Sequence, residues 1–112
     1  MSAPTKTPIA SIVTEHLDQI RRLAADFGVE RLEVYGDAAE GELGPTAPVH
    51  LLVTYPDDYD YGPWLERYIA LYEAYEAVLG RMVHLTMDGA QATSPHRGRT
   101  IQETRRPIYA AP

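Results

Sequence analysis

Apolar residues recur at steps of three and four in two long stretches of the chain, the spacing that gives a helix one apolar face. The first stretch carries Ile9, Ile12, Val13, Leu17, Ile20, Leu23, Ala24 and Phe27, and the second carries Trp64, Leu65, Tyr68, Ile69, Tyr72, Tyr75 and Leu79. Thr7 and Pro8 suit the start of the first helix, and Gly28 and Gly80 suit the two C-terminal ends. The pattern predicts helices over residues 8–27 and 64–79.

Three short segments have the composition of β-strands. Residues 31–35 alternate, with Leu32 and Val34 on one side and Glu33 and Tyr35 on the other, which predicts a strand buried on one side only. The segments 49–55 (VHLLVTY) and 81–87 (RMVHLTM) are more apolar. Glycine, proline and polar residues predict loops over 37–48, 56–63 and 88–98, the first with a helical turn near 38–41.

A last short helix is predicted over residues 100–106, with Thr100 as its cap and Glu103 three residues later. Helices therefore surround three strands along the chain. This order predicts an α/β (α+β) fold, in which helices pack on a small mixed sheet of three to four strands. The length of 112 residues indicates a single domain over 1–112.

Composition narrows the function classes. The chain has no cysteine, so disulfides, zinc ribbons and cysteine nucleophiles are excluded. Ten Lys+Arg against sixteen Asp+Glu give a net charge of −6, which makes nucleic acid an unlikely partner for the surface as a whole. The opening MSAPTKTP lacks the apolar stretch of a signal peptide, and no apolar run reaches about 18 residues. We therefore expect a cytoplasmic protein with no membrane partner.

Three segments carry a family resemblance: FGVERLEVYG (27–36), VHLLV (49–53) and, after the second helix, LGRMVHLTM (79–87). In the order and spacing of these segments, the chain resembles the minimal nucleotidyltransferases of the polymerase-beta-like superfamily. The resemblance continues to the closing RRPIYA. The resemblance implies a nucleotidyltransferase-like topology. It also implies a HEPN-type protein partner, because such proteins often pair with HEPN domains in prokaryotic toxin–antitoxin modules.

In that family a Gly-Ser pair follows the first strand, an Asp-x-Asp pair enters the second, and a third carboxylate lies on the third. The carboxylates hold two Mg²⁺ ions that bridge the triphosphate of an NTP. In this sequence Gly36 is kept, but Asp37 replaces the serine, Pro48 and His50 replace the aspartate pair, and His84 replaces the third carboxylate. Mg²⁺ and NTP are thus cofactors of active relatives, and none is expected here.

The placement of charge also disfavours catalysis. Active relatives usually carry arginine after the Gly-Ser pair, whereas this chain has no Lys or Arg between Leu32 and Leu65. Seven acidic residues lie there: Glu33, Asp37, Glu40, Glu42, Asp57, Asp58 and Asp60. Without a metal they would repel a triphosphate. The residues predict a pseudoenzyme, and together with the resemblance they predict that it is retained as a homodimer or as the binding partner of a HEPN-type protein.

Several alternatives remain open. If the second and third strands are neighbours, His50 and His84 could meet and, with Asp37, hold Zn²⁺ or Ni²⁺. Such a histidine-containing or rearranged metal site could still transfer a nucleotide from an NTP. The two histidines could instead change charge near neutral pH and act as a pH switch. They could also belong to a sensor of a small molecule or metal, or simply fill the vacated pocket. The tyrosines near and on the second helix could form a dimer or partner interface, or pack in the core.

Overall fold

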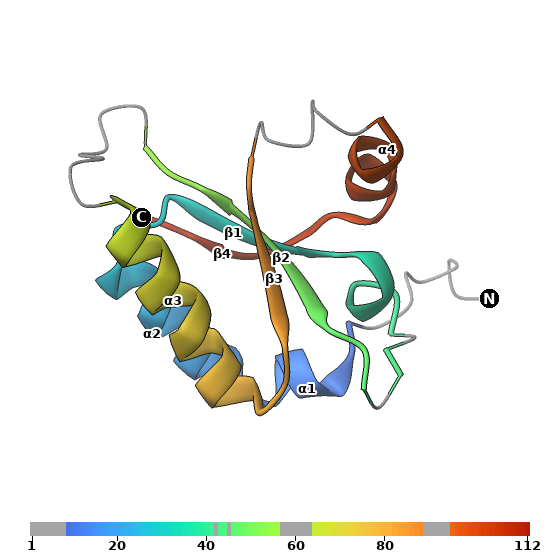
Figure 1. The fold of residues 1–112 in the computed structure, drawn as a ribbon, viewed down its shortest axis with the longest axis horizontal. Coiled ribbons are helices and arrows are strands. Elements are labelled where there is room, and N and C mark those ends of the chain that lie inside the picture. The colour runs from blue at the N-terminus through green and yellow to red at the C-terminus, as the bar shows by residue number, and fades with distance from the viewer. Residues whose placement is uncertain (1–8, 42, 45, 57–63, 89–94) are drawn as a thin grey trace.

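The computed structural model describes residues 9–41, 43–44, 46–56, 64–88 and 95–112 (Figure 1). Its helices are α1 (Ser11–Thr14), α2 (Leu17–Asp26), α3 (Trp64–Leu79) and α4 (Pro95–Thr104), and a 3₁₀ turn, η1, spans Gly36–Ala38. Its strands are β1 (Arg31–Tyr35), β2 (Val49–Thr54), β3 (Val83–Met87) and β4 (Arg106–Ala110). Thr7 and Pro8, the expected cap of the first helix, lie outside the described residues.

The four strands form one mixed sheet in the order β3-β2-β1-β4. β1 is antiparallel to both β2 and β4, whereas β2 and β3 run parallel. A parallel pair needs a crossover, and α3 supplies it. The predicted α+β class and the small mixed sheet are confirmed. Among the described residues, no helix is long and apolar enough to cross a membrane.

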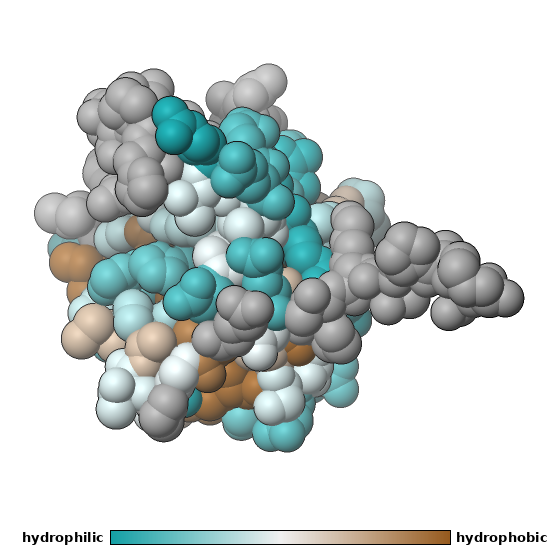
Figure 2. Space-filling model, turned by 90° about the vertical axis from the view of Figure 1, so that its right-hand side faces the viewer, coloured by the Kyte–Doolittle hydropathy of each residue, from teal (hydrophilic) through white to brown (hydrophobic). Residues whose placement is uncertain are grey.

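Helices cover both faces of the sheet (Figure 1). α2 and α3 pack together on one face, over a core that includes Val34, Leu51 and Leu71. On the other face α4 packs on β1, and its Ile101 forms a smaller cluster with Tyr35 and Leu52. Figure 2 shows a face that is hydrophilic at the level of α4 and apolar at the level of α1.

β1 is buried on both sides, and the expectation of a half-buried strand is wrong. Glu33 and Tyr35 are only 5% and 4% exposed. Alternation along a strand identifies two faces but does not say whether the second is covered. Here Ile101 of α4 covers Tyr35, and the Arg105 guanidinium neutralises the Glu33 carboxylate.

The predicted first helix is broken at Glu15–His16 into α1 and α2. An imidazole nitrogen of His16 donates a hydrogen bond to the Ile12 carbonyl oxygen at 2.8 Å. That carbonyl would otherwise accept the backbone N–H of His16, which instead bonds the Val13 oxygen at 3.1 Å. A side chain therefore competes with the backbone ladder, and apolar periodicity cannot register this.

The C-terminal prediction needs two corrections. The last helix is Pro95–Thr104 rather than 100–106, so Thr100 lies inside it and is not its cap. Residues 106–110, given no strand in the prediction, form β4 at the edge of the sheet. Pro107 suits an edge strand because it has no N–H to donate. The other boundaries agree within about three residues, the usual uncertainty of boundaries expected from sequence, and Gly28 (φ +72°) and Gly80 (φ +67°) follow α2 and α3 as predicted.

Candidate functional site

The turn after β1 is the first part of the candidate site. Gly36 has φ +74°, a conformation that side-chain-bearing residues rarely adopt, so the chain can leave β1 sharply and enter η1. The Gly36 N–H donates to Oγ1 of Thr104 at 2.8 Å, and that hydroxyl donates to the Thr100 carbonyl at 2.6 Å. A hydroxyl in the last turn of α4 therefore already accepts the Gly36 N–H at this bend. Asp37, the next residue, is exposed.

Three rings lie in register across three strands. Tyr35 is paired with His50 between β1 and β2, and His50 with His84 between β2 and β3. The ring centroids of Tyr35 and His50 are 5.2 Å apart, and those of His50 and His84 are 4.8 Å apart in an edge-to-face arrangement. The predicted approach of the two histidines is confirmed.

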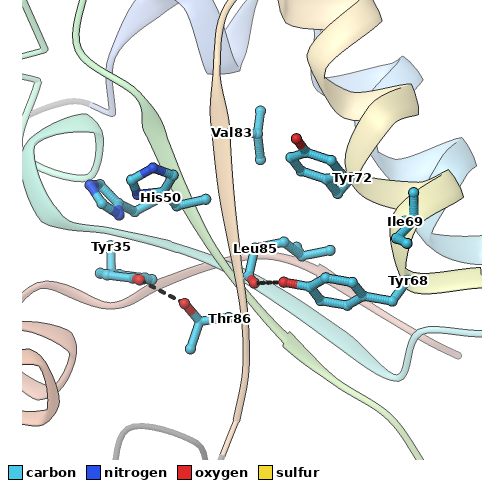
Figure 3. A pocket seen from close by; sticks show the side chains of 9 residues that line it. Tyr35, His50, Tyr68, Ile69, Tyr72, Val83, Leu85 and Thr86 are labelled. Carbon is cyan, nitrogen blue, oxygen red and sulfur yellow. Dashed lines mark hydrogen bonds between the residues drawn. The ribbon is translucent and has the colours of Figure 1, made fainter. Parts of the chain in front are cut away.

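His50 separates two hollows. One, of about 270 Å³, lies beside the bend and is lined by Tyr35, Gly36, Asp37, Ala47, Pro48, His50 and Thr100. The other, of about 370 Å³, is lined by Tyr35, His50, Tyr68, Ile69, Tyr72, Val83, His84, Leu85 and Thr86 (Figure 3). The structure thus gathers Gly36, Asp37, Pro48 and His50 around the smaller hollow. His84 lines only the larger one.

These side chains do not fit a pair of magnesium ions. Mg²⁺ requires near-octahedral oxygen ligands, whereas His50 and His84 offer nitrogen and Pro48 offers no side-chain donor. Within the described part of the chain, no three His, Cys, Asp or Glu side chains lie close enough together to hold a metal. Asp37 is therefore not assembled with the two histidines into the three-ligand zinc or nickel set that the sequence left open.

The charges at the site differ from the sequence expectation in one respect. Glu33 is not part of an acidic rim, because it is buried and its carboxylate accepts from Nε of Arg105 at 3.2 Å. This ion pair and hydrogen bond raise the pKa of Arg105. Asp37 and Glu40 are exposed as expected. Glu42, Asp57, Asp58 and Asp60 lie outside the described residues.

Sequence reasoning missed two arginines that reach the connector between β1 and β2. Nη1 of Arg81 donates to the carbonyl oxygens of Gly44 and Ala47, at 2.8 and 2.9 Å. Nη1 of Arg106 donates to the Ala39 carbonyl at 3.0 Å. The partners are 34 to 67 residues apart in the chain, so no local motif could have shown them. These guanidinium groups fix the connector beside the bend.

Replacing Thr104 by valine tests how much its hydrogen bond with the Gly36 N–H stabilises the bend. Valine keeps the volume but leaves the Gly36 N–H without its acceptor, and we expect the free energy of unfolding to fall by about 1–2 kcal/mol. Urea denaturation measures the change, and Thr104→Ser, which keeps the hydroxyl, should cost much less. Equal losses in the two variants would contradict a role for this hydrogen bond.

The comparison with known proteins decides the family. Over 87 residues, 78% of this chain and 81% of the relative, the sequence is 36% identical to the protein adenylyltransferase MntA of Thermococcus cleftensis. The chain belongs to the minimal nucleotidyltransferase family. A search of protein-family models gave no match.

Solved structures of this family share the fold. A minimal nucleotidyltransferase superposes with a TM-score of 0.67 at 22% identity, over 87% of this chain and 93% of the other. An MNT antitoxin structure, determined with a tri-AMPylated HEPN toxin of Shewanella oneidensis, gives a TM-score of 0.59 at 12% identity, over 88% of this chain and 72% of that one. The nucleotidyltransferase-like topology implied by the sequence is confirmed.

Proposed function

We propose that this minimal nucleotidyltransferase is catalytically inactive and serves as the binding partner of a HEPN-type protein in a toxin–antitoxin-like module. One observation carries the proposal. His50 and His84 lie side by side, 4.8 Å apart, at the positions where the family resemblance places metal-binding carboxylates. The strands that position the site are kept, but their side chains offer imidazole nitrogen in place of carboxylate oxygen.

The first support is the loss of oxygen ligands. Two-metal nucleotidyl transfer needs carboxylates that hold both ions against the triphosphate and the attacking oxygen. Pro48, His50 and His84 supply no carboxylate, and Asp37 lines the smaller hollow but not the one that His84 lines. No step of metal-assisted transfer can be assigned to these side chains.

The second support is the bend itself. Phosphate-binding turns present free backbone N–H groups and avoid negative side chains. The Gly36 N–H is already bonded to Thr104, and Asp37 occupies the first residue beyond it. Two like charges 4 Å apart repel by about 4 kcal/mol at an effective dielectric of 20. A triphosphate at this turn would therefore meet a carboxylate and find the Gly36 N–H already bonded.

The partner is proposed by likeness to relatives. One similar structure is described as a HEPN toxin in complex with an MNT antitoxin, and another as the toxin–antitoxin MntA-HpeT. Both share this fold at TM-scores of 0.59 and 0.64. A fold shared at such low identity supports a class of partner for this chain, but it does not locate the surface that would bind that partner. A homodimer is the competing assembly.

The test combines this chain with the product of the neighbouring gene, which the proposal expects to be a HEPN-type protein, with ATP and Mg²⁺ present. Size exclusion with light scattering should give a complex of the two chains, and intact-mass spectrometry should find both masses unchanged. A catalytically active family member, run with its own partner, controls for the assay. A HEPN-type protein that gains a nucleotidyl group would contradict the inactivity, and two chains that elute separately would contradict the partnership.

The proximity of His50 and His84 also favours a second candidate, an active nucleotidyltransferase with a histidine-bound metal. Thermal unfolding with Zn²⁺ or Ni²⁺ separates the two. We expect the same small shift in wild type and in His50→Ala, because two imidazoles converge with no third ligand among the described residues, and a stable site needs at least three protein ligands. A rise in melting temperature that is present in wild type and absent in His50→Ala would support the second candidate.

A further inference from the structure

The outer edge of β3 plays no part in the candidate site. β3 stands at one end of the strand order, and among the described strands only β2 pairs with it. Backbone hydrogen bonds of 3.0 and 2.8 Å join residues 82 and 88 to β2. In a parallel ladder, alternate residues direct their N–H and C=O groups to the same neighbour. The backbone groups of the intervening residues therefore face outward, away from β2: Val83, Leu85 and Met87.

Two side chains of α3 already hold backbone groups on this outer edge. The Glu76 carboxylate accepts the Val83 N–H at 3.0 Å. The Tyr68 hydroxyl donates to the Leu85 carbonyl oxygen (Figure 3). Burial first, and then two neighbouring tyrosines, raise the pKa of Tyr68, so its hydroxyl keeps the proton that it donates. Side chains of a helix thus make hydrogen bonds that a further strand would otherwise make.

The opposite edge of the sheet, β4, shows a similar arrangement. Nε of Arg21, on α2, donates to the Ile108 carbonyl oxygen at 2.8 Å. Pro107, in the same strand, has no N–H to donate. Unpaired backbone groups along an edge strand are a template for pairing with another chain, and proteins avoid such pairing by covering the edge. Each edge strand of this sheet has a helix side chain bonded to its backbone.

We propose that Tyr68 and Glu76 close the outer edge of β3 to a second copy of this chain. A second copy fits this edge because a two-fold axis lets two identical strands pair antiparallel. In such a pair centred on Leu85, each Leu85 carbonyl oxygen would accept from the other copy, and each Val83 N–H would donate to it. Those are the two groups that α3 already holds.

Exposed apolar side chains lie on the two elements that meet at this edge. Ile69 of α3 is 43% exposed, and Met82, directly before β3, is 59% exposed. An open edge strand beside exposed apolar surface favours self-association, so closing the edge has a physical reason. The closure is independent of the proposed loss of catalysis, and it leaves other surfaces for a homodimer or a HEPN-type partner.

Removing both side chains tests the closure. Tyr68→Leu/Glu76→Ala frees the outward groups and keeps good helix-forming residues in α3. Light scattering over about a hundredfold range of concentration should give a mass that rises above that of the wild type. Amide exchange at Leu85 should slow at least about tenfold at the highest concentration, because its outward N–H becomes paired. Tyr72→Leu/Glu73→Ala makes the same substitutions at residues without a bond to the described part of β3, and should match the wild type.

In the wild type, exchange at Leu85 should not depend on protein concentration. Circular dichroism establishes that each variant is folded, and Glu76→Ala alone provides the same test if the double variant is not. A folded variant whose mass and Leu85 exchange equal those of the wild type at every concentration would overturn the proposal. Association that leaves Leu85 exchange unchanged would also overturn it, because the contact would then lie on another surface. Concentration-dependent protection of Leu85 in the wild type would contradict the closure directly.

Discussion

Replacing Tyr75 by alanine is expected to lower the free energy of unfolding by about 3–5 kcal/mol. Tyr75 is fully buried between α3 and α2, and its hydroxyl donates to the Ile20 carbonyl oxygen at 3.2 Å. Removing the ring leaves a cavity beside Ile20 and Leu71, both also fully buried. Chemical denaturation measures the change. Tyr72→Ala, on the same helix but half-buried, should cost clearly less.

Tyr75 also makes the free energy of unfolding depend on pH in the alkaline range. Burial raises the pKa of its hydroxyl above the ordinary value near 10. The folded state therefore favours the protonated hydroxyl. Its contribution to the free energy of unfolding is fully present below about pH 10 and is lost as pH rises above that value. Tyr75→Phe should lose about 1 kcal/mol at neutral pH and show a weaker decline in alkali. An identical alkaline decline in wild type and Tyr75→Phe would contradict this assignment.

Glu33→Gln is expected to cost about 2–4 kcal/mol, because it leaves the guanidinium of Arg105 with only the more distant Asp88 carboxylate, 3.6 Å away, in a partly buried site. Glu33 is 5% exposed, and its Oε2 lies 2.5 Å from Nη2 of Arg105 and 3.5 Å from Nε of Arg31. The pair joins β1 to the end of α4 and so helps to position Thr104 over Gly36. Glu103→Gln, which removes an exposed carboxylate from α4, is the control.

The double variant Glu33→Gln/Arg105→Gln sharpens this prediction. Removing both charges should cost less than the sum of the single substitutions, because neither partner is left as an unpaired charge. Strictly additive costs would show that the two side chains act independently.

The sequence specified one part of the site well. Alternation along two strands, together with the family topology, placed His50 and His84 on the same face, and the parallel register of β2 and β3 brings them together. The glycines after α2 and α3 were equally clear, because a left-handed residue at a helix end has few alternatives to glycine. These features depend on local geometry or on the topology of the family.

Other parts depended on side chains distant in sequence. The Gly36 N–H and Thr104 are 68 residues apart, and Glu33 and Arg105 are 72 apart. Neither contact leaves a periodic signal. The break at His16 depends on one imidazole taking the Ile12 carbonyl, and β4 is a five-residue edge strand that contains a proline. Apolar periodicity describes which face is buried, and it carries no information on such specific hydrogen bonds.

The central claim is that this minimal nucleotidyltransferase does not bind an NTP through metal ions. Isothermal titration of the wild-type protein with ATP in Mg²⁺, repeated with EDTA, tests it most directly, with an active family member as the positive control. The account predicts no saturable heat for this chain under either condition, because Pro48, His50 and His84 stand where the family resemblance places the carboxylates. Saturable binding of ATP that requires Mg²⁺ and disappears in EDTA would contradict it.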